Sequence, residues 1–482
     1  MNSEYLDVLI VGAGLSGIGA ACHLMRECPT KTFAILENRE NMGGTWDLFR
    51  YPGIRSDSDM FTLGYNFKPW TNPKAISDGG SILCYIKETA RENNIERHIR
   101  YSHQVTSANW SSKDSLWTIL ITDGVTGIEK EITCNFFLSC TGYYNYEVGH
   151  EPDFKGKKEF SGQIVHPQHW PEDLDYTGKR VVVIGSGATA ITIVPAMAKK
   201  AAHVTMLQRS PTYMVSVPEL DEGINRLRRK LSDKWVYRLA RTRNIGLGLG
   251  IYHFSRRFPE KTKSLLLAEI QKQLPNDYDM KHFTPHYNPW DERLCMVTDG
   301  DMFKGISNDT ISIVTDHIES FTKTGLRLKS GEVLDADIVV TATGLNLQML
   351  GGINLSVDEK PFVIPEKMVY KGVLIEDLPN FGVVMGYTNA SWTLKADLVS
   401  EYVCRLINAM DKKGARQCVA NNNNSKINHA SILDLKSSYI QRSLDKLPKQ
   451  GSQVPWKLRQ NYALDMLTLR LGKMNDGIVR FS

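Results

Sequence analysis

Two short segments combine glycines with a later charged residue at the spacing that dinucleotide binding requires. The first reads Gly12-Ala13-Gly14-Leu15-Ser16-Gly17, and Glu37 follows 20 residues after its last glycine. The first glycine permits a tight turn, the second lets a pyrophosphate approach the backbone, and the third allows a helix to pack closely on a strand. A carboxylate at position 37 can accept hydrogen bonds from ribose hydroxyl groups. The segment therefore predicts a site for FAD or NAD, whose ribose carries no 2′-phosphate.

The second segment repeats this pattern but ends in the opposite charge. It reads Gly185-Ser186-Gly187-Ala188-Thr189-Ala190, and the pair Arg209-Ser210 begins 19 residues after it. An arginine at this position suits a ribose 2′-phosphate, and hence NADPH, although a plain surface arginine at a strand end is the alternative. Two complete turns, one followed by Glu and the other by Arg, predict two different dinucleotides in one chain.

The first turn is followed by a third segment, Gly43-Gly44-Thr45-Trp46-x4-Tyr51-Pro52-Gly53-x3-Asp57. Its paired glycines make a flexible loop, and Tyr-Pro-Gly fixes a further turn. We interpret this segment as a lid over the isoalloxazine ring of a flavin, with Asp57 as a charged group near that ring. The alternative is a surface loop with an aromatic plug, in which Arg50 and Arg55 pair with Asp57 and Asp59 as surface ion pairs.

A dense cluster of distinctive residues lies just before the second turn. It reads Phe160-x-Gly162-x3-His166-x3-Trp170-Pro171. Five fixed positions in twelve residues match by chance only roughly three times in 10⁷ starts at average residue usage. The alternative is that these side chains only pack between two domains, in a segment that Pro167 and Pro171 make rigid. Pro167 makes a regular helix unfavourable, so His166 and His169 do not predict a metal site.

Strands and helices at the expected places would position these motifs. Apolar, β-rich runs precede both turns at 7–11 and 179–184, helical periodicity follows each turn, and further strands are expected at 32–36 and 203–207. We predict an α/β fold of two Rossmann-like dinucleotide-binding domains, for FAD and NADPH, the second inserted in the first, with a helical insertion. The expected bounds are 1–150 for the first part of the FAD-binding domain, 151–214 and 291–335 for the NADPH-binding domain, 215–290 for the helical insertion, and 336–482 for the return segment and C-terminal region.

The composition excludes several classes of protein. The 482 residues are 42% hydrophobic and 23% charged, and a net charge of +5 gives no reason to expect nucleic-acid binding. The N-terminus lacks the basic region of a secretory signal, and no apolar run approaches about 18 residues. Eight scattered cysteines contain no CxxC pair, which argues against disulfides, zinc and a flavin disulfide reductase. We therefore expect a cytoplasmic protein.

The segment 226–263 carries twelve Lys and Arg residues against two acids, interleaved with Trp235, Tyr237 and Leu239. Such a run is most often a solvated helical face, and we favour that interpretation. A basic amphipathic region in weak contact with a membrane surface, which would make the protein peripheral to the membrane, is the alternative.

Together the motifs resemble those of the class B flavoprotein monooxygenases, and specifically the type I Baeyer–Villiger monooxygenases. Their fingerprint FxGxxxHxxxWP matches 160–171, and their signature GGxWxxxxYPGxxxD matches 43–57. The resemblance implies that FAD and NADPH serve to insert one atom of O2 next to a ketone carbonyl through a C4a-peroxyflavin, giving an ester or lactone. Sulfides or thioamides would be oxidised as well. The related N- and S-oxygenating flavin monooxygenases lack the terminal Trp-Pro, and an enzyme of that type without ester formation is the alternative.

The resemblance also implies roles for individual residues. Arg293 would stabilise the peroxyanion and the oxyanion of its adduct, Asp57 would orient Arg293, and His166 would couple domain movement to nicotinamide placement. Contacts to FAD are implied for Thr45, Trp46, Asp47, Leu48 and the backbone at Val105; Ser16, Gly44, Arg55 and Ser56, which stand in or beside the motifs, are further candidates. Contacts to NADPH are implied for 185–190, Arg209 and Ser210.

One position departs from the family pattern. Several members have Lys immediately before the catalytic Arg, where it helps to hold the 2′-phosphate, but this sequence has Glu292. Arg209 would then hold that phosphate largely alone. Neither the substrate nor the oligomeric state follows from these residues.

Overall fold

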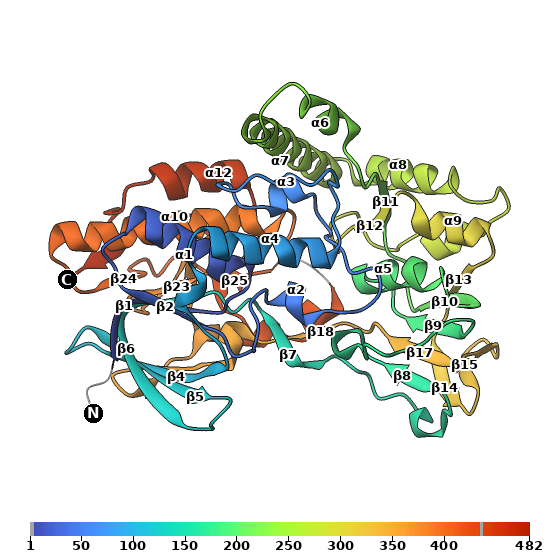
Figure 1. The fold of residues 1–482 in the computed structure, drawn as a ribbon, viewed down its shortest axis with the longest axis horizontal. Coiled ribbons are helices and arrows are strands. Elements are labelled where there is room, and N and C mark those ends of the chain that lie inside the picture. Colours follow the sequence, from blue (N-terminus) through green and yellow to red (C-terminus); the bar gives the residue numbers. More distant parts are fainter. Residues whose placement is uncertain (1–3, 434–436) are drawn as a thin grey trace.

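The computed structural model describes residues 4–433 and 437–482. The two largest β-sheets lie at opposite ends of the molecule, with helices stacked above them (Figure 1). The predicted α/β fold with two Rossmann-like units is confirmed. No helix of the described residues is long and apolar enough to cross a bilayer.

The first sheet is built around β1, whose last four residues, 8–11, are buried. β1 pairs in parallel with β2 and β6, and β23 pairs in parallel with β6. The long antiparallel pairs β4–β5 and β5–β6 extend the same sheet. Its strands are β1 (Glu4–Val11), β2 (Phe33–Leu36), β3 (Ile99–Arg100), β4 (His103–Ser111), β5 (Leu116–Asp123), β6 (Glu129–Ser139), β19 (Asn354–Val357), β20 (Lys360–Pro361), β21 (Val369–Tyr370), β22 (Leu374–Ile375) and β23 (Phe381–Val383).

The second sheet is entirely parallel, in the order β13-β10-β9-β17-β8. Its strands are β8 (Gln163–Val165), β9 (Arg180–Ile184), β10 (His203–Gln208), β13 (Ile311–Thr315) and β17 (Ile338–Thr341). We expected the chain to return to the first domain at residue 336, but this is wrong for β17. The buried apolar residues of β17 complete the second sheet, and Ile338 pairs with Val181 of β9. The first sheet is resumed only at β19.

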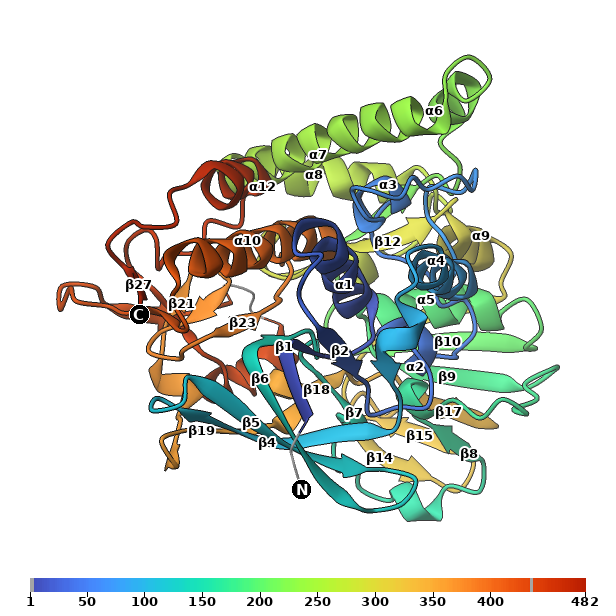
Figure 2. The same cartoon turned by 60° about the vertical axis from the view of Figure 1, so that its left-hand side comes forward.

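Helices cover both sheets and form a separate layer. α1 (Leu15–Glu27) and α10 (Trp392–Lys413) lie side by side over the first sheet (Figure 2). α5 (Ala188–Met197) follows the second turn, and α6 (Glu222–Leu227), α7 (Asp233–Arg257) and α8 (Pro259–Gln271) form the upper layer (Figure 1). The other helices are α2 (Thr45–Leu48), α3 (Met60–Leu63), α4 (Gly79–Glu92), α9 (Asp301–Ser307), α11 (Ser438–Gln441) and α12 (Tyr462–Met466).

Small sheets join these layers. The pair β7 (Tyr144–Gly149) and β18 (Leu345–Leu347) connects the two halves, and β11 (Met214–Val217) pairs with β12 (Cys295–Thr298) beside the helical layer. The remaining strands are β14 (Ile318–Thr322), β15 (Gly325–Leu328), β16 (Val333–Asp335), β24 (Cys418–Ala420), β25 (His429–Ser431), β26 (Lys449–Gly451) and β27 (Val479–Phe481).

Candidate active site

The first nucleotide turn is held by contacts that leave no room for side chains. Gly12 has φ +102°, and a Cβ atom there would lie 2.6 Å from the carbonyl oxygen of Cys140. A Cβ atom on Gly17 would lie 1.8 Å from the carbonyl oxygen of Gly12. The turn therefore brings the N-terminus of α1, with its unpaired backbone N–H groups, to the end of β1, where a pyrophosphate can bind.

Glu37 stands at the end of β2 beside this turn. Its carboxylate accepts hydrogen bonds from the backbone N–H groups of Ala13 at 2.7 Å and Arg39 at 3.0 Å. Burial raises the pKa of Glu37, and these two hydrogen bonds oppose that rise. A carboxylate fixed by two backbone groups next to the turn is where a ribose hydroxyl would be recognised.

The second nucleotide turn repeats this construction at the end of β9. Gly185 has φ +136°, and a Cβ atom there would lie 2.4 Å from the carbonyl oxygen of Ala342. The Ser186 hydroxyl donates a hydrogen bond to the Ser210 carbonyl at 3.0 Å. The structure thus joins two residues predicted to contact NADPH, while Arg209 beside them is exposed.

The segment 43–57 spans both halves of the molecule. Gly44 lies against the first turn, since a Cβ atom on Gly14 would be 3.5 Å from the Gly44 Cα atom. Further along, Gly53 has φ +77°, and a Cβ atom there would lie 2.6 Å from the Ala196 Cβ atom in α5. The segment therefore packs between the two nucleotide turns as well as beside the first.

A cavity of about 1050 Å³ opens between the two turns. Most residues predicted for the first cofactor line it, and some of those predicted for the second do so too. They are Gly12, Gly14, Ser16, Glu37, Gly44, Thr45, Trp46, Arg55, Ser56, Asp57, Val105, Ala188, Thr189 and Arg293. Gly17, Asp47, Leu48, His166, Gly185, Ser186, Gly187, Ala190, Arg209 and Ser210 do not line it.

Arg293 and Asp57 form an ion pair at the wall of the cavity. The Nη1 atom of Arg293 lies 2.8 Å from Oδ2 of Asp57, although the two residues come from opposite halves of the sequence. Burial lowers the pKa of Arg293, but the Asp57 carboxylate together with Tyr143, Tyr144 and Tyr439 outweighs this effect and raises the pKa above its ordinary value. The arginine therefore presents a permanent positive charge to the cavity.

Several polar atoms at the cavity wall have no hydrogen-bond partner among the described residues. They include Nε of Arg293, Nε1 of Trp290, Nη2 of Arg55 and Oδ1 of Asn389, all of them buried. Buried polar atoms are almost always paired in folded proteins, so these groups fit a polar molecule bound in the cavity. With the two glycine turns and Glu37, these three donors and the Asn389 acceptor suit FAD.

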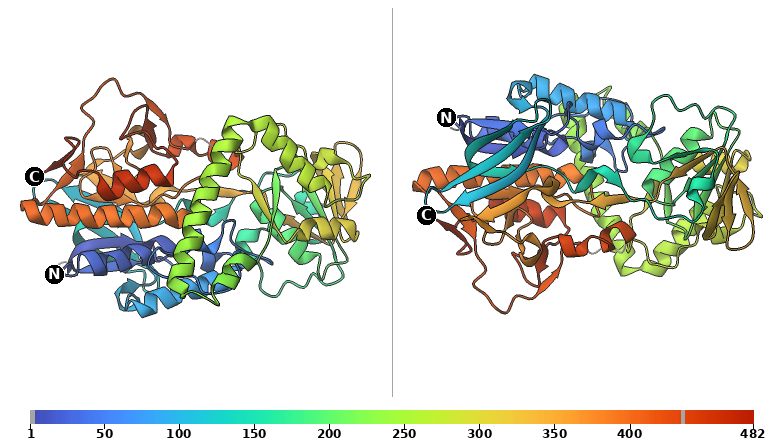
Figure 3. Two further views of the ribbon diagram at one scale, coloured as in Figure 1. Left: turned by 90° about the horizontal axis from the view of Figure 1, so that it is seen from above. Right: turned by 90° about the horizontal axis from the view of Figure 1, so that it is seen from below.

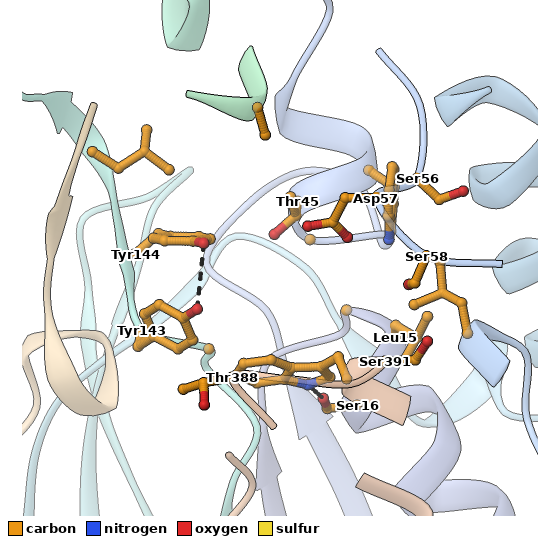
Figure 4. Close-up of a pocket in the computed structure, with 18 of the residues that line it drawn as sticks. Leu15, Ser16, Thr45, Ser56, Asp57, Ser58, Tyr143, Tyr144, Thr388 and Ser391 are labelled. Carbon is orange, nitrogen blue, oxygen red and sulfur yellow. Dashed lines mark hydrogen bonds between the residues drawn. The ribbon is translucent and has the colours of Figure 1, made fainter. Parts of the chain in front are cut away.

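Three tyrosines that were given no role from the sequence also line the cavity wall. The hydroxyl groups of Tyr143 and Tyr144 lie 3.4 Å apart, and a dashed line marks this hydrogen bond in Figure 4. Tyr146 lies 3.2 Å from the Thr45 hydroxyl, and burial raises its pKa to about 12, so it is neutral. The string Tyr143-Tyr144-Asn145-Tyr146 was the available signal, since it directly follows the strand-end glycine Gly142.

The alternative in which Arg50 and Arg55 pair with Asp57 and Asp59 is wrong. Arg50 binds Asp47 at 2.9 Å, and Arg55 binds Asp301 at 2.7 Å. Asp47 is itself buried and also binds Arg39 at 2.6 Å, so its side chain is used within the protein. Asp57 is left for Arg293 because the tertiary fold, and not sequence distance, decides which charges meet.

His166 lies at the end of β8, away from the cavity. Its Nδ1 atom accepts a hydrogen bond from the backbone N–H of Gln168 at 3.2 Å, and its Nε2 atom is buried without a partner among the described residues. The ring presses on the strand that connects the two halves, because a Cβ atom on Gly149 would lie 2.0 Å from its Cε1 atom. Burial lowers the pKa of His166, so the ring is neutral near pH 7.

Two family models match the chain. One is described as flavin-binding monooxygenase-like and covers residues 69–225, and the other, an NAD(P)-binding Rossmann-like domain, covers residues 10–70. The FAD-containing monooxygenase EthA of Mycobacterium tuberculosis is 52% identical over 482 residues, which is 100% of this chain and 98% of EthA. The chain belongs to this family of FAD-containing monooxygenases. The probable FAD-binding monooxygenase AlmA of Acinetobacter baylyi is 50% identical to the chain, over 99% of it and 96% of AlmA.

Solved structures share the fold of this monooxygenase. An oxidized steroid monooxygenase bound to NADP superposes with a TM-score of 0.78 at 22% identity, over 99% of both chains. OTEMO in complex with FAD and NADP gives a TM-score of 0.77 at 20% identity, over 100% of both chains. The flavoprotein monooxygenase family predicted from the motifs is confirmed.

Proposed function

We propose that the enzyme uses FAD and NADPH to insert one atom of O2 next to a ketone carbonyl, giving an ester or lactone. We also propose that it oxidises the sulfur of sulfides or thioamides. The observation that supports this most directly is the Arg293–Asp57 pair, which directs a fixed positive charge into the cavity between two dinucleotide turns.

The chain offers a separate cradle for each cofactor. The first turn and Glu37 would hold the pyrophosphate and ribose of FAD, and the second turn would hold NADPH. When bound, these cofactors supply the redox chemistry and the activation of oxygen. The protein supplies orientation, exclusion of water and fixed charge.

Arg293 is suited to the step in which oxygen adds to a carbonyl carbon. Negative charge then develops on the carbonyl oxygen, and a positive charge already in place stabilises it without reorganisation. Asp57 serves as the positioning residue, because it holds one end of the guanidinium group and leaves Nε without a partner among the described residues. A lysine has no such planar fork and would not be held in the same way.

His166 would act on cofactor placement and not on protons. It does not line the cavity, and its ring packs against the β7 strand that joins the two halves. A shift of the second sheet relative to the first would change the packing of the His166 ring against β7.

Replacement of Arg293 with Ala tests the proposal. We expect NADPH-driven flavin reduction to persist and ester or sulfoxide formation to fall by roughly 10²–10³-fold, since one preorganised charge is lost. Products from a cyclic ketone and an aryl sulfide would be quantified by gas chromatography. Arg180→Ala, which removes an arginine at the far end of β9, serves as the control and should retain activity.

Each outcome of this test is informative. Full product formation by Arg293→Ala would contradict the role given to this residue. Sulfoxide without ester from any ketone in the unchanged enzyme would favour the N- and S-oxygenating alternative.

A further inference from the structure

The outer side of α7 exposes large apolar side chains that no described part of the protein covers. These side chains are between 42% and 59% exposed. At 100° per residue the five that belong to α7 fall within one half of the helix circumference, which also holds the buried Val236 and Ala240 near the start of the helix, and the sixth is its C-cap residue. We call them the outer α7 face; they are Trp235, Leu239, Leu247, Ile251, Phe254 and Phe258.

Cations surround this face. α7 carries six Lys and Arg residues and one acid, Asp233. Arg238 lies over the Trp235 ring at 5.6 Å, and Lys261, from the start of α8, lies over the Phe258 ring at 5.4 Å. Arg257 also lies over Phe258, at 5.7 Å.

These cations are available to an external anion. Arg238, Arg257 and Lys261 are exposed and have no carboxylate partner in the described part of the chain. By contrast, Arg241 and Arg256 of the same helix bind Asp397 and Asp291. An apolar face edged with unneutralised cations is the composition that lies in the interface of an anionic membrane.

The other side of α7 faces the cavity. Ile245, Leu249 and Tyr252 line it, so a single helix separates the cavity from the outer α7 face. Ile251 belongs to both, since it lines the cavity and is 56% exposed. Seen from above, α7 and α8 lie across the junction of the two halves (Figure 3).

We propose that the outer α7 face docks the enzyme on an anionic lipid surface and that lipophilic substrates pass from the lipid into the cavity beside Ile251. The docking stands on the exposed face and its cations, while the delivery of substrate rests on the proposed oxygenation. Charge complementarity favours a lipid surface over a second copy of this chain, because a second copy would bring its own uncompensated cations to the same face.

Vesicle flotation of the full-length, FAD-loaded enzyme tests the docking. We expect it to float with vesicles of phosphatidylglycerol and phosphatidylcholine, less so in high salt, and not with phosphatidylcholine alone. The triple variant Arg238→Gln, Arg257→Gln, Lys261→Gln should lower the partition coefficient on the order of 100-fold. Trp235→Ser with Phe258→Ser should also abolish flotation.

Matched controls distinguish a loss of lipid binding from a loss of folding. Val125→Ser removes an apolar side chain that is 81% exposed and lies between β5 and β6, so it should leave flotation unchanged. The α7 variants should keep their turnover of a water-soluble sulfide, because all the altered side chains are exposed.

Every other result would overturn the inference. Equal flotation with both kinds of vesicle, or none with either, would remove the role of anionic lipid. A dimer in light scattering that Trp235→Ser dissociates, without flotation, would assign the face to a second copy.

Delivery of substrate has its own measurement. The α7 variants should raise KM for a long-chain ketone supplied in vesicles and leave KM for the water-soluble sulfide unchanged. An unchanged KM for both would refute delivery while docking stands. If no ketone or sulfide is oxidised at all, the proposed function fails, but flotation still decides the docking.

Discussion

At the scale of single residues, the second nucleotide turn brings together arginines from distant parts of the sequence. Arg209 follows β10, and its Nη2 atom lies 3.5 Å from the Ser438 hydroxyl at the start of α11. Arg442, just after α11, lies beside the loop that follows β17, since a Cβ atom on Gly344 would lie 3.8 Å from its Nη2 atom. We propose that Arg442 supplies the second cation for the 2′-phosphate that Glu292 does not.

The neighbouring charges agree with a phosphate site. Burial lowers the pKa of Arg442, and the charge of Arg209 lowers it further. Burial raises the pKa of Glu292, and Arg209 opposes that rise. Two cations that repel one another would be stabilised by a dianion placed between them.

Arg209→Ala and Arg442→Ala should each raise KM for NADPH. A charge-assisted contact is worth about 1.5–3 kcal/mol, so the rise should be roughly 10–100-fold, with KM for NADH little changed. Steady-state kinetics with both nucleotides measure this, and Arg180→Ala is the control. If Arg442→Ala leaves the NADPH to NADH ratio unchanged, Arg442 is not a phosphate ligand.

At the scale of elements, α7 carries three glycines near its centre. Gly246, Gly248 and Gly250 lie within it, and a Cβ atom on any of them would meet no atom within 4 Å. These glycines are therefore not required for packing, and each weakens the helix by about 1 kcal/mol relative to Ala. The part of α7 that lines the cavity is thus also its least stable part.

Gly246→Ala and Gly250→Ala should stabilise α7. We expect slower hydrogen exchange in peptides covering 240–255 and about 0.5–1 kcal/mol of added local stability for each change. Gly305→Ala in α9 is the matched contrast, because its Cβ atom would lie 2.2 Å from Cδ1 of Ile311 and should destabilise the protein. Equal losses at Gly250 and Gly305 would contradict this account.

At the scale of the whole molecule, a buried charge network ties three distant helices together. His23 of α1 binds Glu27 at 3.0 Å and Asp397 of α10 at 3.4 Å, and Arg241 of α7 binds Asp397 at 3.3 Å. Burial disfavours the protonated imidazole, but the hydrogen bonds to Asp397 and Glu27 outweigh it and raise the pKa of His23 to about 9. The helical layer is therefore joined to the first domain by charge.

This network predicts how stability depends on pH. Because the pKa of His23 is higher in the folded state, its contribution is fully present below about pH 6.5 and is lost as pH rises through about 9. Between pH 6.5 and 9.5 the melting temperature of His23→Gln should fall less than that of the unchanged protein. The difference between the two melting temperatures should therefore become smaller. A difference that stays constant across this range would show that His23 is not protonated in the folded protein.

Much of the fold was predictable because its signals are local. Glycine spacing, the strands before each turn and the residues at positions 37 and 209 specify two dinucleotide units, since a tight turn and a ribose contact require only nearby residues. Family motifs indicated Arg293 and Asp57 before their distance was known. The location of β17 was mispredicted because an apolar strand does not reveal which sheet it will join.

The sequence by itself determined the two nucleotide turns, the monooxygenase family and the candidate charged pair. Only the tertiary structure decided that Arg55 binds Asp301, that Arg442 lies near Arg209, and that α7 has a cavity on one side and an exposed basic face on the other. The physical reason is that these features depend on contacts between residues tens to hundreds of positions apart. Such contacts are set by how the sheets and helices pack, and no local spacing records them.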